Sequence, residues 1–481
     1  MLRKIFTNKI LIYLATRYGT YAIQFVLSMV IAAKLGPYYL GIYGFVNLII
    51  SYFGQINFGI PHSLNVLLVH HKDDEKLNGN YIGNALWLYG ILSFVVIILY
   101  VVVKIFNIKI SDDYPIDSYL FLITAIAILT YINAILTTVL RVKNKVNQLS
   151  VVQSLSVLLN FSVVFMFSGE SLILALLITN LLACILTVGI TIRSNVLPQF
   201  SNVSLNKGLQ KEIVNKGFYL FLYNSCFYFI LISIRTIISG NYSVEEFGAF
   251  TFSFTIANAV LLLLDSLMAI IFPKIIDLLS SDNNEQIERT IENMRLGYVS
   301  SSHFLVYVAM LFFPILILLL PKYDNALTSM NLISLAVLMN LISSGYSNLL
   351  IAHNKEKVSA MISIVALVIN IFLGLFIVKI VKVEFSYVII ATLLTYLIFS
   401  FLCVWKGRAI ISQPSVLSTL KIFFPIRLLI PYLGALVISI FKLEYFIWIP
   451  LALYLILNWR DLKTMKCMVS KIINNPNIAD I

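Results

Sequence analysis

Charged residues are scarce in this chain of 481 residues. They make up 12% of the sequence, whereas hydrophobic residues make up 60%, and the mean hydropathy is +0.94. Such values exclude an ordinary soluble domain and are typical of proteins that cross the membrane many times. The polar stretches between the apolar runs are short, so the sequence leaves no room for an extramembrane domain that could carry soluble chemistry.

Cysteine is rare, and the common catalytic motifs are missing. The four cysteines, Cys184, Cys226, Cys403 and Cys467, are scattered and lack the spacing of a metal site or of a disulfide in an exported loop. The sequence contains no glycine-rich P-loop, no HExxH pattern and no nucleophile elbow. We therefore expect that this chain hydrolyses no ATP and holds no metal or other cofactor.

Long apolar runs are abundant instead. About fourteen follow one another, and a helix of about 20 residues, rising ~1.5 Å per residue, crosses the ~30 Å hydrocarbon core of a bilayer. The runs are continuous rather than alternating, which favours helices over the strands of a barrel. The sequence thus predicts an all-α polytopic membrane protein. The predicted spans are 10–35, 39–69, 81–103, 119–140, 149–167, 172–192, 217–238, 247–276, 296–320, 326–351, 358–381, 385–405, 422–441 and 445–459.

The basic residues are unevenly distributed between the two sides of these spans. The net charge is +12, and most of the 34 basic residues fall in the joints on the side of the N-terminus. Cytoplasmic loops of membrane proteins carry such an excess of Lys and Arg. We therefore expect both termini to be cytoplasmic, and we interpret the charge as orienting the protein among membrane lipids rather than as binding nucleic acid.

The two halves of the chain share sparse identities in the same helix order. Asn8-Lys9, Gly41 and Asn144-Lys145 recur at a nearly constant offset as Asn215-Lys216, Gly248 and Asn354-Lys355. Coincidence among apolar segments is one explanation, and a duplicated six-helix unit is the other. Six crossings return the chain to its starting side, so two such lobes share one orientation about an axis along the membrane normal. The predicted division is 1–195 for the first lobe, 196–214 for a cytoplasmic linker, 215–406 for the second lobe and 407–481 for a terminal helix pair with its tail.

Arg17 and Asp265 are ionisable residues deep inside predicted spans. Arg17 lies roughly 10 Å beyond the cytoplasmic edge, where an arginine is costly unless it faces a cavity or a partner. It either snorkels or bonds to nearby carbonyls, or it binds an anion such as a phosphate. Asp265 lies at a similar depth on the same side. It either bonds locally, pairs with Arg17 as a cytoplasmic gate, or takes up a proton or cation.

Further polar residues accompany Arg17 on the first two spans and Arg235 on the seventh. Gln24, Asn47, Gln55 and Asn57 either line a cavity suited to sugar hydroxyls or bond between helices. The second span is long and contains Gly54, Gly59 and Pro61, which predicts a bend. Arg235 lies near the outer end of its span and either snorkels or forms a second phosphate contact.

The stretch from Ser280 to Arg295 is the longest charged joint. Ile287, Ile291 and Met294 recur in it at helical spacing, and Asp282 is a candidate cap. This pattern predicts an amphipathic helix on the cytoplasmic surface, and we interpret it as a connector that links the two lobes.

The run from Lys34 to Tyr43, KLGPYYLGIY, after a first span that carries Arg17, resembles the opening of the polysaccharide-biosynthesis transporters. These are the Wzx-type O-antigen or capsule repeat-unit flippases of the multidrug/oligosaccharidyl-lipid/polysaccharide (MOP) exporter superfamily. The similarity in layout covers almost the full chain, as two six-helix lobes followed by a terminal pair.

The resemblance implies a bacterial inner-membrane flippase that moves an undecaprenyl-pyrophosphate-linked oligosaccharide from the inner to the outer leaflet by alternating access. Arg17 and Arg235 match the cationic residues that would meet the pyrophosphate, although Asn224 stands where Arg17 would repeat. Asp265 is the candidate for coupling to an ion gradient. Partner proteins implied by the resemblance are a polysaccharide polymerase and a chain-length regulator.

Two other functions remain open from the sequence. A drug or small-cation exporter of the same superfamily, as in the MATE transporters, would favour acidic cavity residues, whereas the intramembrane bias here is basic. A membrane polymerase or glycosyltransferase would need a sizeable outer loop, and the longest predicted outer joint, 104–118, is short.

Overall fold

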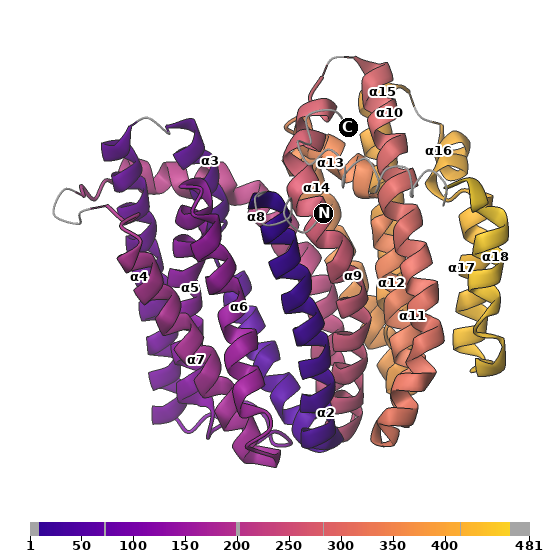
Figure 1. Cartoon of the computed structure of the whole chain (residues 1–481), viewed down its shortest axis with the longest axis horizontal. Coiled ribbons are helices and arrows are strands. Elements are labelled where there is room, and N and C mark those ends of the chain that lie inside the picture. Colours follow the sequence, from indigo (N-terminus) through magenta and orange to yellow (C-terminus); the bar gives the residue numbers. More distant parts are fainter. Residues whose placement is uncertain (1–8, 72–73, 199–202, 282, 414, 462–481) are drawn as a thin grey trace. The chain divides into compact units, whose positions relative to one another are not determined.

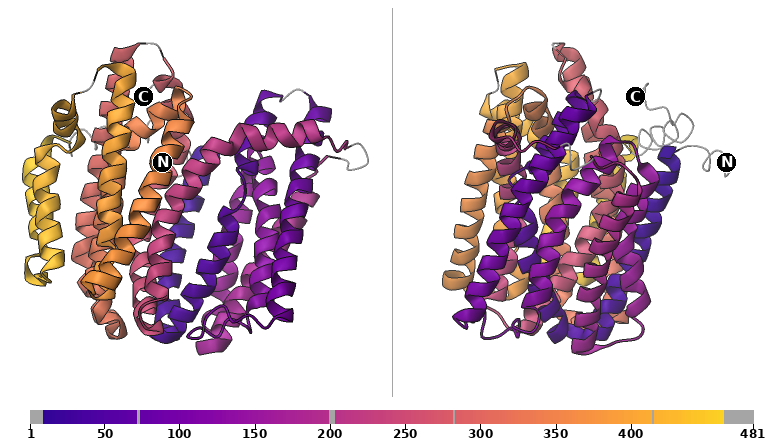
Figure 2. Two further views of the ribbon diagram at one scale, coloured as in Figure 1. Left: turned by 180° about the vertical axis from the view of Figure 1, so that it is seen from behind. Right: turned by 90° about the vertical axis from the view of Figure 1, so that its left-hand side faces the viewer.

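The computed structural model describes residues 9–71, 74–198, 203–281, 283–413 and 415–461, and those residues form helices without strands. Helices satisfy their own backbone groups, which long apolar segments require in lipid. The predicted all-α, multi-pass class is thereby confirmed. Within each of two compact units the long helices run side by side (Figures 1 and 2). The first unit is Ala15–Ser225, and the rest of the described chain forms the second.

The helices of the first unit, in chain order, are α2 Lys9–Gln55 from Ala15 onward, α3 Ile60–His70, α4 Glu75–Ile105, α5 Leu120–Val142, α6 Val146–Val163, α7 Gly169–Arg193 and the first part of α8 Lys207–Ser239. Those of the second unit, after the remainder of α8, are α9 Val244–Leu279, α10 Asn284–Met294, α11 Ser300–Leu319, α12 Leu327–Leu341, α13 Ser344–Ala352, α14 Glu356–Phe376, α15 Ile390–Ile411, α16 Val416–Phe423, α17 Ile426–Ile440 and α18 Ile449–Leu457.

Most predicted spans fall largely on one of these helices, but 39–69 is divided between α2 and α3, and 326–351 between α12 and α13. Eight helices of the described chain are long and apolar enough to cross a membrane, and there are ten if each of two bent pairs is one span. The predicted number is about fourteen. One reason for the difference is α2, a single helix by this count, which departs from helical geometry at Gly36 with φ 65° and ψ 174°. That position lies at the predicted joint between the first two spans.

The predicted surface connector at 280–295 is correct as an amphipathic helix and wrong as a link between lobes. Ile287, Ile291 and Met294 are buried on one face of α10, and α10 packs against α9 and α13. The helix continues through the π-helical turn Arg295–Val299 into α11, so it extends a spanning helix within the second unit. Asn283 caps it by accepting hydrogen bonds from two backbone N–H groups, while Asp282 lies outside the described residues.

The segment just before α8, residues 203–206, is hydrogen-bonded to α4 and packs against it. The fully buried Asn84 donates to the carbonyl of Ser204 at 2.9 Å and accepts from the N–H of Asn206 at 3.0 Å. A side chain on Gly83 would collide with Val203, since an added Cβ would lie 2.2 Å from its Cγ1. The unit division falls later, after Ser225 and inside α8, and the predicted limits of the lobes stay a prediction.

Candidate functional site

Arg17 is half-buried on α2 in the first unit. Its guanidinium carbon lies 5.2 Å from the centre of the Tyr21 ring, a distance at which the ring's negative face attracts the cation. One turn away, Thr20 shares a hydrogen bond of 3.0 Å with Ser154 of α6. This bond fixes α2 against α6 and so sets the direction in which the Arg17 face of the helix points.

Gln24 continues the same face of α2. Residues 17, 21, 24 and 28 are spaced by four, three and four positions, so they form one stripe along the helix. Gln24 is exposed, while Tyr21 and Ser28 are half-buried. The sequence analysis singled out Arg17 and Gln24 but missed Tyr21 and Ser28. The polar stripe, as we call these four residues, combines a guanidinium, a phenol, an amide and a hydroxyl on one face of a membrane helix.

Asn47 belongs to a hydrogen-bonded network between helices. Its amide donates to the carbonyl of Tyr43 at 2.8 Å, and the Tyr43 hydroxyl is hydrogen-bonded to the side chains of Asn47 and Asn180. Asn180 of α7 in turn accepts hydrogen bonds from Ser156 and, at 3.5 Å, from Asn160, both on α6. Asn47 thus bonds to Tyr43 within α2 and is linked to α7 only through the Tyr43 hydroxyl, and its role in a substrate cavity stays a prediction.

Asn57 braces the break between α2 and α3. Its amide nitrogen donates to the carbonyl of Gly54 at 3.1 Å, and its amide oxygen accepts from the N–H of Gly59 at 2.9 Å. Gly59 has φ +70°, a conformation that favours glycine. The second span, which the sequence predicts to be bent, is therefore divided into two helices, α2 and α3. Gln55 is the last residue of α2, and its carbonyl accepts from Ser225 at 3.4 Å.

Arg235 lies in the second unit, where it is 8% exposed. Its guanidinium carbon is 4.9 Å from the ring centre of Phe254 and 5.9 Å from that of Phe247, both on α9. The side chain thus packs inward against aromatic rings rather than extending to an interface, contrary to the snorkelling alternative. A phosphate could reach this guanidinium only after the packing around it opens.

Asp265 falls on α9, but its side chain lies outside the described residues. The predicted pairing with Arg17 therefore stays a prediction. No group of His, Cys, Asp and Glu residues in the described part of the chain could hold a metal ion.

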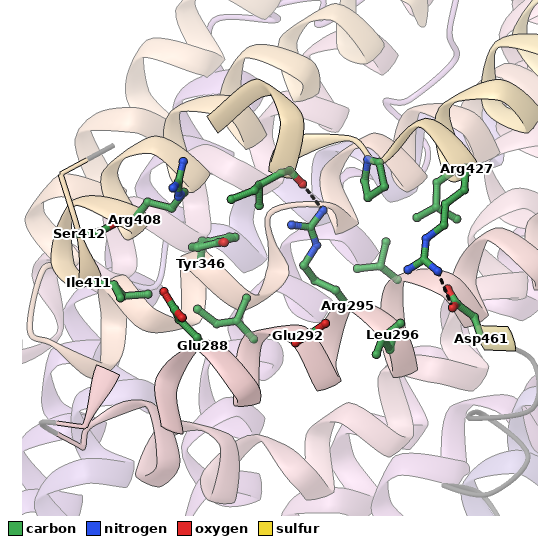
Figure 3. Close-up of a pocket in the computed structure, with 15 residues that line it drawn as sticks. Glu288, Glu292, Arg295, Leu296, Tyr346, Arg408, Ile411, Ser412, Arg427 and Asp461 are labelled. Carbon is green, nitrogen blue, oxygen red and sulfur yellow. Dashed lines mark hydrogen bonds and ion pairs between the residues drawn. The ribbon is translucent and has the colours of Figure 1, made fainter. Parts of the chain in front are cut away.

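A cavity of about 430 Å³ in the second unit was not predicted (Figure 3). Six charged residues line it: Glu288, Glu292, Arg295, Arg408, Arg427 and Asp461. The sequence analysis treated its three arginines only as part of the cytoplasmic charge excess. Arg295 and Arg408 are separated by more than a hundred residues in the sequence. Only the prediction that all three arginines lie on the same side of the membrane indicated that they could lie close together.

The fold resembles solved transporters of the MOP superfamily. An inward-facing MATE family transporter matches with a TM-score of 0.64 and 13% identity, over 83% of this chain and 98% of that one. The lipid II flippase MurJ, in its inward closed conformation, matches with a TM-score of 0.67 and 14% identity, over 95% of this chain and 99% of that one. A Pyrococcus furiosus MOP transporter, described as having a binding pocket of reverse polarity, matches with a TM-score of 0.62 and 14% identity, over 83% of this chain and 94% of that one.

At these identities the likeness shows the fold alone, which is that of a multi-pass membrane transporter. No curated protein shows significant sequence similarity to the chain. The family model described as polysaccharide biosynthesis protein matches residues 6–279, which is more than half of the sequence. The family that the sequence resembles is thereby confirmed: the chain belongs to the polysaccharide biosynthesis protein family.

Proposed function

We propose that this protein is a flippase for an undecaprenyl-pyrophosphate-linked oligosaccharide, such as an O-antigen or capsule repeat unit. It moves the glycan from the inner to the outer leaflet of the bacterial inner membrane by alternating access, with both termini in the cytoplasm. Membership of the polysaccharide biosynthesis family supports this function. So does the match to a solved lipid II flippase over 95% of the chain. The observation that carries the proposal is the polar stripe with Arg17 on a membrane helix.

In this proposal Arg17 binds the pyrophosphate. A guanidinium keeps its charge when water is removed and donates two parallel hydrogen bonds to phosphate oxygens. The Tyr21 ring, 5.2 Å away, stabilises the cation without neutralising it as a carboxylate would. Gln24, two turns from Arg17 on the same face, contacts the first sugar or the phosphate.

The other predicted site residues have supporting roles in the proposal. Asn47 and Asn57 already have hydrogen-bond partners within the chain, so they shape the polar lining, and Gln55 at the end of α2 offers its amide to sugar hydroxyls. Arg235 meets the pyrophosphate in a conformation that opens its aromatic packing. Asp265 couples transport to a proton or cation gradient. A polymerase and a chain-length regulator act on the product.

A small-molecule exporter is the second candidate, because the MATE fold matches with a TM-score of 0.64. Such a transporter carries cations and needs acidic groups in its cavity. The stripe on α2 carries a guanidinium and no carboxylate, which favours an anionic substrate. A polymerase or glycosyltransferase is less well supported, since the solved structures that match are transporters and a flippase.

Deletion and complementation test the proposal. Loss of the gene should make lipid-linked repeat units accumulate in the cytoplasmic leaflet, and the wild-type protein should remove them. Arg17→Ala should fail to do so, and Arg17→Lys should restore part of the activity because it keeps the charge but loses the bidentate geometry. Lys34→Ala is the matched control, since Lys34 is an exposed cation on the same helix and should be dispensable. Full rescue by Arg17→Ala would remove Arg17 from the mechanism.

A further inference from the structure

The cavity of the second unit gathers three arginines from three different elements. Arg295 stands at the junction of α10 and α11, Arg408 in the last turn of α15, and Arg427 in the first turn of α17. Figure 3 shows their guanidinium groups in a row, with Glu288 and Glu292 below them in this view. We call this cavity of about 430 Å³ the arginine pocket.

Two of the three guanidinium groups bond to neutral oxygens. Arg295 Nη2 donates to the carbonyls of Ile422 and Phe423, the latter at 3.3 Å, which satisfies carbonyls at the C-terminal end of α16. Arg408 Nη1 donates to the hydroxyls of Ser418 at 2.9 Å and Thr419 at 3.0 Å. Arg295 is also hydrogen-bonded to Tyr346. None of these bonds neutralises the positive charge, and a guanidinium has five N–H donors, so donors remain for a ligand.

The acidic residues of the pocket are placed differently. Asp461 accepts a hydrogen bond from Arg427 Nη1 at 2.7 Å and is 5% exposed. The opposite charges of this pair therefore neutralise each other. Glu288 and Glu292 are exposed on α10, where water screens their charge. The half-buried Arg295 and Arg408 therefore form the part of the lining that is best suited to an anion.

Exposed apolar side chains lie on the two helices beside the pocket. α16 is short and bends by 67° from α17, and its Val416, Leu417 and Leu420 are exposed. The next helix exposes Ile426 and Ile430 at its start. Amphipathic helices that expose an apolar face beside cationic side chains bind in the headgroup region of a membrane. The pocket thus adjoins apolar surface along which acyl chains could lie.

We propose that the arginine pocket binds the phosphate of an anionic phospholipid of the cytoplasmic leaflet, whose acyl chains lie along the exposed side chains of α16 and α17. Basic pockets between membrane helices on the cytoplasmic side suit such headgroups, and charge-assisted bonds from guanidinium to phosphate are strong. The lipid joins α11, α15 and α17 around α16 and so holds the terminal helix pair to the rest of its unit. This site uses none of the residues of the polar stripe, and only the choice of leaflet rests on the proposed function.

Lipid titration of the full-length, delipidated protein in neutral detergent tests the proposal. Phosphatidylglycerol and phosphatidylcholine are added separately, and the Kd of each is measured by native mass spectrometry. The wild type should bind phosphatidylglycerol at least about tenfold more tightly, because the choline cation of phosphatidylcholine offsets the charge of its phosphate beside the arginines, whereas phosphatidylglycerol keeps a net negative charge. Arg408→Gln should remove most of this preference.

Two controls separate lipid binding from a structural effect. Arg289→Gln removes an exposed cation of α10 that pairs with Glu285 at 2.5 Å and does not line the pocket, so the lipid preference should persist. The double change Ser418→Ala with Thr419→Ala removes the structural partners of Arg408 but keeps its charge, and the preference should persist here too. If Arg408→Gln does not fold, Arg408→Lys replaces it in the titration. Its preference for phosphatidylglycerol should lie between that of the wild type and no preference.

A third titration with inorganic phosphate distinguishes a lipid from a soluble anion. Phosphate should compete only at a Kd far weaker than that of phosphatidylglycerol, because it lacks acyl chains. Equal binding of the two lipids by the wild type would overturn the proposal. So would an unchanged preference in Arg408→Gln, or a Kd for phosphate that matches that for phosphatidylglycerol.

Discussion

At the scale of single residues, the polar side chains of the membrane helices divide into those bound within the chain and those on accessible faces. Asn57 and Asn84 have both ends of their amides engaged, so they hold local structure. Arg17 and Gln24 lie on a half-buried to exposed stripe. A residue type alone does not distinguish these two uses, and for Asn84 the partners lie more than a hundred residues away in the sequence.

Replacement of Tyr21 by Leu should weaken transport without abolishing it. The ring supports the Arg17 cation by an interaction worth about 0.5–2 kcal/mol, so we expect the rate of lipid-linked glycan translocation to fall severalfold, less than in Arg17→Ala. Tyr38→Leu, which removes an exposed tyrosine further along α2, is the control and should transport normally. A Tyr21→Leu rate equal to wild type would show that the ring does not support the guanidinium.

Replacement of Asn84 by Ala should loosen the segment that precedes α8. It removes one hydrogen bond from the carbonyl of Ser204 and one from the N–H of Asn206, both on exposed residues, at a cost of about 0.5–1.5 kcal/mol for each bond. We expect faster limited proteolysis between α7 and α8 and a lower Tm. Asn147→Ala, at an exposed position of α6, should change neither, and an unchanged cleavage rate in Asn84→Ala would contradict the role assigned to this side chain.

At the scale of helices, α3 lies close to α8 because a glycine at their contact carries no side chain. A Cβ added at Gly217 would lie 2.2 Å from Ser63 Oγ and 2.8 Å from the carbonyl oxygen of Gly59. Such distances require a shift of backbone, not only of a side chain. The interrupted second span is therefore held both by Asn57 within it and by the absence of a side chain on its neighbour.

A matched pair of glycine substitutions tests this packing. Gly217→Ala should destabilise the protein by about 1–3 kcal/mol, as overpacked sites do. Gly90→Ala should be neutral or stabilising by about 0.5–1 kcal/mol, because alanine favours helix and an added Cβ there meets nothing within 4 Å. Thermal unfolding in detergent measures both. Equal Tm changes for the two variants would mean that α3 and α8 do not pack as closely as described.

At the scale of the whole molecule, the sequence predicted the fold class and most of the helices, because apolar length and helical periodicity are local properties. The family was predicted from the resemblance of the run from Lys34 to Tyr43. The bend near Gly59 and the buried face of α10 were predictable for the same reason. The arginine pocket was not, since Arg295, Arg408 and Arg427 come together only through tertiary packing. The polar composition of 196–214 indicated a linker, yet Asn84 holds the backbone at 204–206 and α8 begins at Lys207.

Reconstitution into liposomes tests the central claim that a membrane-embedded Arg17 carries a diphosphate-linked glycan across the bilayer. Undecaprenyl-pyrophosphate-linked oligosaccharide is placed in both leaflets, and the fraction accessible to an added, membrane-impermeant glycosidase is followed with time. We expect the wild-type protein and Lys34→Ala to expose the protected pool, and Arg17→Ala to do so at least about tenfold more slowly, the effect of losing a charged hydrogen bond. Exposure by Arg17→Ala at the wild-type rate, or none by the wild type, would contradict the account.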